Sequence, residues 1–118
     1  MQVAIYIRIG NKPEELSFTE ALEQRKLREY AEQHGYDICA AVTEYAAGSD
    51  PRPVLERLLS APSERFQAIL TAKPTSLCRD TFGCAAWERK AASHGKQFIF
   101  AEDFAIRKVI SDKTNGSR

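Results

Sequence analysis

The stretch VAIYIRIGN, residues 3–11, decides the fold. Val, Ile and Tyr favour a pleated, buried surface, and a segment that is apolar on both faces is typical of a central strand in a parallel sheet. Arg8 is the one charged residue inside the segment, and Gly10 would allow the backbone to turn sharply at its carboxyl end. Because open α/β sheets bind ligands at the carboxyl ends of their strands, we expect the functional site where this strand ends.

Helical and extended patterns alternate along the rest of the chain. Strands are predicted at residues 36–43, 66–72 and 97–101, and helices at residues 18–35, 51–60 and 81–94. Asp50 is the predicted cap of the short middle helix. The alternation predicts an α/β fold with three layers, α/β/α, around a mainly parallel sheet of four or five strands.

Two segments are harder to assign. Residues 11–17 resemble a loop, and the first helix carries apolar residues on opposite faces at its two ends, which predicts an irregularity at residues 22–25. Residues 104–110 suit either an edge strand or the start of a helix, and residues 111–118 resemble a flexible tail. We therefore expect one domain over residues 1–103, followed by this terminal segment.

Length and charge limit the classes of protein to consider. The chain has 118 residues, 43% of them hydrophobic and 28% charged, with a net charge of +1, so it can bury a core without disulfides. No apolar run has the roughly 20 residues that a membrane span needs, and we expect a cytoplasmic protein. Since the net charge is close to zero, contact with DNA would have to come from a local group of arginines.

The cysteines and histidines do not indicate a metal or redox site. Cys39, Cys78 and Cys84 form neither a CxxC pair nor an even set, which favours reduced thiols. His34 and His94 each precede a glycine at a predicted helix end, where a capping role is expected. We expect no metal and no cofactor.

Three arginines are predicted at or just beyond the carboxyl ends of strands: Arg8, Arg52 and Arg79. The planar guanidinium suits bidentate contact with phosphate, so three of them converging on one cleft would form a phosphate pocket. Taken as isolated residues, they would more often form surface salt bridges.

The motifs around these arginines resemble the catalytic domain of serine recombinases, the resolvase and invertase family. The matching segments, in order, are YIRIG (6–10), LEQR (22–25), YAEQHGY (30–36), EYAAGSDPRPVLERLL (44–59), FQAILTAKPTSLCRD (66–80) and HGKQFIFAED (94–103). The resemblance covers residues 2–103 and implies a family mechanism in which a serine attacks a DNA phosphodiester while arginines neutralise the developing charge. It also implies assembly into a tetramer and a separate DNA-binding domain.

The resemblance carries over only in part. Arg8, Arg52 and Arg79 match family arginines, and Lys73 and Leu77 match the third element of the pattern, but Gly10 aligns with the nucleophilic serine. Thr75 and Ser76 stand where the family has an aspartate and an arginine. The resemblance therefore implies a degenerate member that does not cleave DNA and works by binding DNA phosphate or a protein partner.

Two alternatives remain open. A relocated nucleophile, drawn from Ser17, Thr75, Ser76 or Cys78, would make the chain an active DNA recombinase. A pure assembly module would use Trp87, unless loops or the tail cover this side chain. The chain stops about where the family's long pairing helix would begin, so we expect weak DNA contact without an added domain, and a homo-oligomer or a protein partner.

Overall fold

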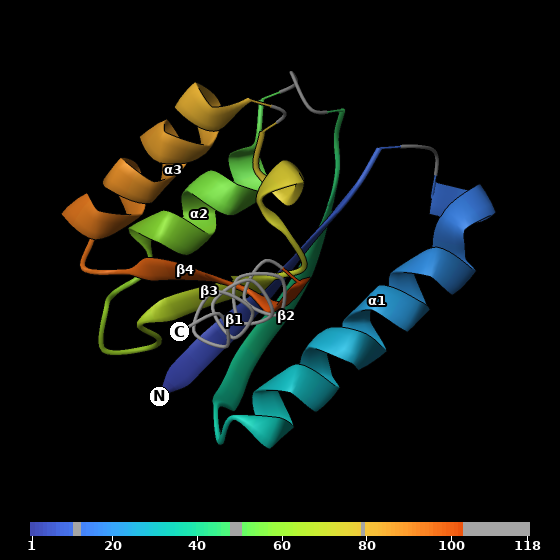
Figure 1. Cartoon of the computed structure of the whole chain (residues 1–118), viewed down its shortest axis with the longest axis horizontal. Coiled ribbons are helices and arrows are strands. Elements are labelled where there is room, and N and C mark those ends of the chain that lie inside the picture. Colours follow the sequence, from blue (N-terminus) through green and yellow to red (C-terminus); the bar gives the residue numbers. More distant parts are fainter. Residues whose placement is uncertain (11–12, 48–50, 79, 103–118) are drawn as a thin grey trace, which may run out of the picture.

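The computed structural model describes residues 1–10, 13–47, 51–78 and 80–102, with the backbone alone for residues 13–19. Four parallel strands form one sheet in the described chain, in the order β2-β1-β3-β4 (Figure 1). Their bounds are Gln2–Ile9 for β1, Asp37–Tyr45 for β2, Ala68–Thr71 for β3 and Gln97–Phe100 for β4. The first strand is therefore central, as the opening stretch predicts.

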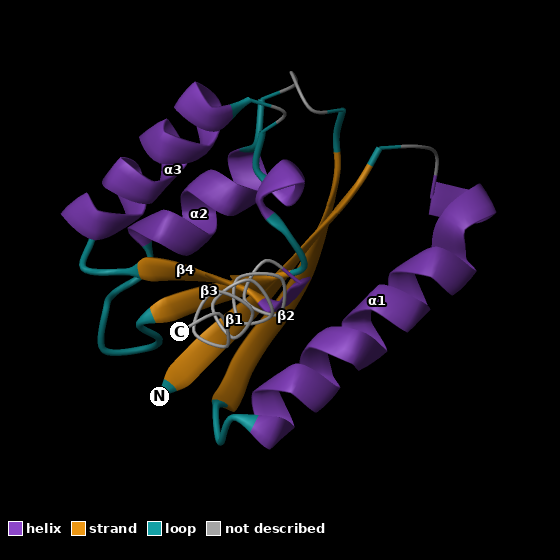
Figure 2. Ribbon diagram, in the orientation of Figure 1, coloured by secondary structure: helices purple, strands orange, loops and turns teal. Residues whose placement is uncertain are grey.

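Helices cover both faces of the sheet. The helix α1 (Pro13–Gln33) lies alone on one face, whereas α2 (Pro53–Ser60) and α3 (Thr81–Ser93) share the other (Figure 2). The predicted α/β/α layering with a parallel sheet is confirmed. A short 3-10 turn, Pro74–Ser76, follows β3 at the carboxyl edge of the sheet.

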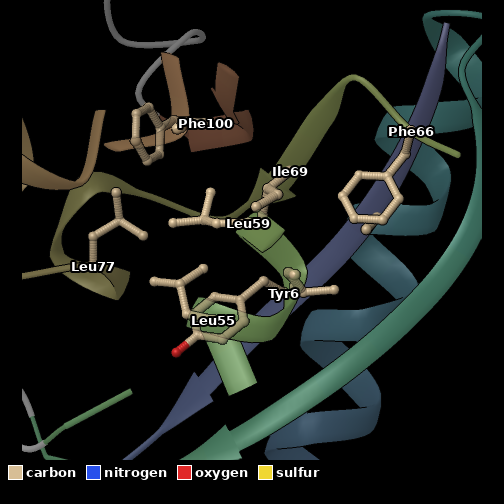
Figure 3. Close-up of a cluster of buried hydrophobic side chains, with 10 residues drawn as sticks. Tyr6, Leu55, Leu59, Phe66, Ile69, Leu77 and Phe100 are labelled. Atoms are coloured by element: carbon tan, nitrogen blue, oxygen red, sulfur yellow. The ribbon is translucent and has the colours of Figure 1, made fainter. Parts of the chain in front are cut away.

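The core consists of two clusters, separated by the alternation of side chains along β1. Val3, Ile5 and Ile7 face α1, and Ala4 and Tyr6 face the other layer. Figure 3 shows this second cluster, which includes Tyr6, Leu55, Leu59, Phe66, Ile69, Leu77 and Phe100. Because β1 is buried on both faces, its position is fixed by packing on either side.

The first helix differs from its sequence-based prediction. It begins at Pro13 and continues without a break to Gln33, so the loop predicted at residues 11–17 is wrong from residue 13 onward, and so is the irregularity predicted at residues 22–25. Proline is well suited to the first helical turn. Leu27 and Ala31 are buried, whereas Leu22 stays 41% exposed. The helix thus leaves some apolar surface uncovered and does not need to kink.

Both predicted His-Gly helix ends are present. Gly35 and Gly95 have φ of 70° and 72°, the left-handed conformation that glycine adopts most easily after a helix. His34 follows α1, with its Nδ1 2.8 Å from the carbonyl oxygen of Tyr30, and His94 is the C-cap of α3. The N-cap of α2 is Arg52, so the prediction that Asp50 caps this helix is wrong. Asp50 itself and the segment 104–118, whose structure was also predicted, lie outside the described residues.

The carboxyl end of α2 is held by a lysine. Lys96 is buried, and its Nζ donates hydrogen bonds to the carbonyl oxygens of Leu59, at 3.0 Å, and Ala61. A cation is favourable at this end of a helix because the last carbonyls lack partners within it. Lys96 therefore ties the segment that precedes β4 to the end of α2.

Three further observations concern the described residues alone. None of their helices is long and apolar enough to cross a bilayer. No group of three or more His, Cys, Asp or Glu side chains among them could hold a metal ion. Cys39, Cys78 and Cys84 are free thiols.

Candidate functional site

Arg8 connects the two loops that leave the carboxyl edge of the sheet. Its Nε and Nη2 donate to the carbonyl oxygens of Ser76, at 3.1 Å, and Thr75, at 2.7 Å. Its Nη1 donates to the carbonyl oxygen of Ala46, at 3.1 Å, in the segment after β2. One guanidinium at the end of the central strand thus joins the loop after β2 to the turn after β3.

Arg52 reaches the same turn from the residue before α2. The side chain is only 3% exposed, and its Nη1 donates to the carbonyl oxygen of Ser76 at 2.9 Å. Arg8 and Arg52 therefore meet at one carbonyl oxygen. The third predicted arginine, Arg79, lies outside the described residues.

Gly10 follows β1 directly and is exposed. Its φ lies outside the left-handed region that favours glycine. The turn predicted after it involves residues 11 and 12, which lie outside the described residues, and stays a prediction. A Cβ built on Gly10 would meet one heavy atom within 4 Å, Nη1 of Arg8 at 3.8 Å, which is an ordinary contact distance. Neither the backbone nor the available space requires glycine at this position.

Replacing Gly10 by serine should therefore leave the fold intact. We expect the free energy of unfolding to change by no more than about 0.5 kcal/mol, as for an unconstrained surface position. Urea denaturation of wild type and Gly10→Ser measures this difference. A loss of more than about 2 kcal/mol would mean that the backbone here does require glycine.

A buried carboxylate bonds to Tyr6 and to the start of α2, the helix that Arg52 precedes. Glu44, near the end of β2, is 4% exposed, and its Oε1 accepts a hydrogen bond of 2.6 Å from the Tyr6 hydroxyl. The same carboxylate accepts hydrogen bonds from the backbone N–H groups of Val54, at 2.8 Å, and Leu55, at 3.2 Å. Glu44 therefore caps the amino end of α2 from a neighbouring strand, with the negative charge that this end of a helix favours.

Sequence reasoning missed this role of Glu44. The available signal was the period-two alternation of Ala40, Val42 and Glu44, which places all three on one face of β2. A carboxylate on a face that packs against a helix needs partners, and the first N–H groups of that helix can provide them.

The network around Glu44 makes stability sensitive to high pH. Burial, followed by the hydrogen bond to Glu44, raises the pKa of the Tyr6 hydroxyl above its usual value of 10.0. The unfolded chain loses this proton near pH 10, whereas the folded chain keeps it. The contribution of Tyr6 to stability is therefore complete below pH 10 and falls as the pH rises further.

Comparison with Tyr6→Phe should reveal this dependence. Above pH 10 the free energy of unfolding of wild type should fall more steeply than that of Tyr6→Phe, with a difference in slope of up to about 1.4 kcal/mol per pH unit. Denaturant titrations between pH 8 and pH 11 measure both slopes, and Tyr36→Phe controls for the loss of a tyrosine elsewhere. Equal slopes for wild type and Tyr6→Phe would contradict the prediction.

The turn after β3 contributes backbone atoms to the site. Leu77 and Ser76 are buried, whereas Thr75 is exposed. The carbonyl of Ser76 accepts hydrogen bonds from Arg8 and Arg52, and the carbonyl of Thr75 accepts one from Arg8. Cys78 is partly buried. Of the proposed replacement nucleophiles, Thr75 and Ser76 lie in the turn that Arg8 contacts and Cys78 follows it closely, whereas the side chain of Ser17 lies outside the described residues.

A small cavity adjoins this edge on the α1 side. Its volume is about 210 Å³, and it is lined by Leu22, Glu23, Lys26, Leu27, Ala72, Lys73, Ala101 and Glu102. Lys73, which matches the family pattern, borders this cavity. Burial and then the nearby charge of Glu102 raise the pKa of Glu23.

The helix α3 begins in tight contact with the turn. Asp80 accepts a hydrogen bond of 2.6 Å from the N–H of Gly83, and a Cβ on Gly83 would lie 2.1 Å from Sγ of Cys78, so this position requires glycine. Trp87 is partly buried against the core, and Nζ of Lys90 lies 5.5 Å from the centroid of its ring. Phe82, on the same helix, is 87% exposed. A role for Trp87 at a partner surface stays a prediction.

The fold and this site define a class: a parallel α/β domain in which arginines gather at the carboxyl end of the central strand. The family model described as "Resolvase, N terminal domain" matches residues 3–116. The chain belongs to this family. It has the fold of a serine recombinase catalytic domain, so the resemblance inferred from the sequence is confirmed.

Solved structures of related domains share the fold. The C-terminal catalytic domain of ISC1926 TnpA, an IS607-like serine recombinase, superposes with a TM-score of 0.73 at 20% identity, over 98% of this chain and 82% of that one. The N-terminal catalytic domain of TP901-1 integrase superposes with a TM-score of 0.73 at 20% identity, over 100% of this chain and 97% of that one. A resolvase family site-specific recombinase from Streptococcus pneumoniae superposes with a TM-score of 0.74 at 11% identity, over 99% of this chain and 89% of that one. No curated protein sequence matches the chain.

Proposed function

We propose that this domain binds DNA phosphate without cutting the strand. The observation that carries the proposal is Gly10: it stands where the family pattern has the attacking serine, and it places no side-chain oxygen next to Arg8. Phosphoryl transfer through a covalent intermediate needs a nucleophile held within contact distance of the phosphorus. Glycine has no side chain and therefore supplies no nucleophile.

The two described arginines have different parts in this proposal. Arg8 is partly exposed and lies at the open edge, so its guanidinium can reach a phosphate oxygen. Arg52 is buried behind it, which favours a positioning role: Arg52 holds the carbonyl of Ser76 and thereby the turn on which Arg8 rests. Arg79 remains a proposed phosphate ligand on the resemblance alone.

Two further substitutions support the loss of strand cleavage. Thr75 and Ser76 occupy the positions of a family aspartate and arginine, and Ser76 is buried. A buried serine hydroxyl neither replaces a positive charge nor reaches a phosphate outside the turn. The changes at residues 10, 75 and 76 thus remove the nucleophile and two charged groups of the family pattern together.

The salt dependence of DNA binding tests the phosphate contact. We expect a labelled 20-base-pair duplex to bind weakly, with the logarithm of the association constant falling by about 0.9 per phosphate contacted for each tenfold rise in salt. Arg8→Gln should make this slope shallower by about one contact, whereas Arg25→Gln, at an exposed ion pair with Glu29 on α1, should leave it unchanged. Circular dichroism should show that both variants stay folded.

A pure assembly module is the second candidate. This candidate is supported by the hydrogen bonds that Arg8 and Arg52 already donate to backbone carbonyls, as expected of arginines with a structural role. In that case DNA binding should be negligible and independent of salt, and a homo-oligomer or a protein partner would be the functional state. The duplex titration separates the two candidates.

A further inference from the structure

The outer edge of β2 is open in the described fold. In the sheet order β2-β1-β3-β4, β2 pairs with β1 on one side only. A shift in register leaves Cys39 without a partner in β1, and from Ala40 to Tyr45 the pairing continues regularly. This stretch has no proline and no lysine, the residues that commonly protect an edge strand from pairing with another chain. Six regular residues are enough to pair with an added strand.

A groove runs beside this edge, between β2 and α2. It has a volume of about 520 Å³, and its lining residues are Ala40, Val42, Thr43, Val54, Arg57, Leu58, Ala61, Arg65 and Phe66. Most of these side chains are apolar, and Ala40, Val42, Val54 and Ala61 are only partly buried although they pack against the core. An apolar hollow next to an open strand edge is the surface that β-strand addition uses.

Two arginines give this groove a charge. Arg57 and Arg65 are both exposed, and neither forms an ion pair with a described carboxylate. Nε of Arg57 donates a long hydrogen bond, 3.5 Å, to the carbonyl oxygen of Pro53 on the same helix. The groove therefore combines apolar lining with two positive charges that an acidic partner would neutralise.

We propose that β2 and this groove bind an extended segment of another protein, with apolar side chains at alternate positions and acidic residues on the same face. The segment adds a strand beside residues 40–45, its apolar side chains enter the groove, and its carboxylates meet Arg57 and Arg65. The docking surface includes none of the arginines proposed to contact phosphate, so each proposal can fail without the other.

Charge argues against a second copy of this chain as the occupant. Antiparallel pairing of two β2 edges places both grooves on the same face of the combined sheet. Arg57 and Arg65 of the two copies would then gather on one surface, and like charges brought together in this way oppose association. An acidic segment from a different protein has no such penalty.

A synthetic peptide tests the proposal directly. The probe is a fluorescein-labelled peptide of sequence Glu-Thr-Val-Thr-Val-Thr-Glu, titrated against the whole chain by fluorescence anisotropy. We expect saturable binding, weakened about tenfold by Val42→Glu in the groove and by Arg57→Gln combined with Arg65→Gln. A version of the peptide with two N-methylated backbone amides should also bind about tenfold more weakly, because the methylated amides cannot donate hydrogen bonds to β2. Arg25→Gln, on α1 across the sheet, is the matched control and should bind like wild type.

Three results would overturn the proposal. They are the absence of saturable binding up to about 1 mM peptide, equal binding of the N-methylated and unmodified peptides, and a wild-type dimer in sedimentation that Val42→Glu dissociates. The last would identify a second copy as the occupant. Thermal melting of each variant shows whether a loss of binding reflects unfolding.

Discussion

Replacing Glu44 by alanine should lower the free energy of unfolding by about 3 kcal/mol or more, the largest loss that we expect from a single polar side chain here. The change leaves the Tyr6 hydroxyl and the N–H groups of Val54 and Leu55 without their acceptor in a buried region. It also removes the negative charge at the amino end of α2. The helix α2 should loosen before the rest of the fold.

Urea denaturation followed by circular dichroism measures this loss. Glu56→Ala is the matched control, because Glu56 lies on α2 and forms an exposed ion pair with Lys90 at 2.6 Å. Such surface pairs contribute about 0–1 kcal/mol. Similar losses for Glu44→Ala and Glu56→Ala would show that the buried carboxylate does not hold α2 in place.

Arg8→Ala should affect stability and DNA binding together. The variant loses three hydrogen bonds to backbone carbonyls, those of Ala46, Thr75 and Ser76. We expect the free energy of unfolding to fall by about 2–3 kcal/mol, because water can partly replace these bonds at the edge of the sheet. In the same variant, DNA binding should lose one phosphate contact, with a shallower salt dependence.

Hydrogen exchange locates the structural part of this effect. The N–H groups of Leu77 and Cys78 both donate to the carbonyl of Pro74 within the turn that Arg8 supports. Their exchange should speed up in Arg8→Ala, whereas amides in the centre of β1 should follow only the global change in stability. Unchanged exchange at both amides would contradict a role for Arg8 in holding the turn.

Most of the fold follows from local patterns in the sequence. The central strand, the alternation with helices and the His-Gly helix ends all depend on residue types whose preferences agree with their surroundings. The start of α1 was mispredicted because Lys12-Pro13 was interpreted as a break, although proline also suits the first helical turn. The irregularity predicted in the same helix was wrong because an apolar residue such as Leu22 is expected to be buried, whereas Leu22 remains exposed.

The parts of the site that the sequence did not reveal depend on contacts between distant segments. Glu44 caps a helix that begins nine residues later, Lys96 reaches the end of α2 across the fold, and Gly83 is required because Cys78 lies against it. The family resemblance found Arg8, Arg52 and Gly10, but it could not show that both arginines hold the backbone of one turn. Such pairings arise from the tertiary structure, because neither periodicity nor spacing encodes them.

Strand cleavage is the most direct test of the central claim that this domain has kept Arg8, Arg52 and Arg79 of a serine recombinase site but lacks the attacking oxygen. The purified chain, incubated with a supercoiled plasmid library of random inserts, should give neither nicked DNA nor a covalent complex on a denaturing gel. Mass spectrometry of the recovered protein should find no residue bonded to a nucleotide. A phosphodiester adduct on Thr75, Ser76, Cys78 or Ser17 would contradict the claim and identify the relocated nucleophile.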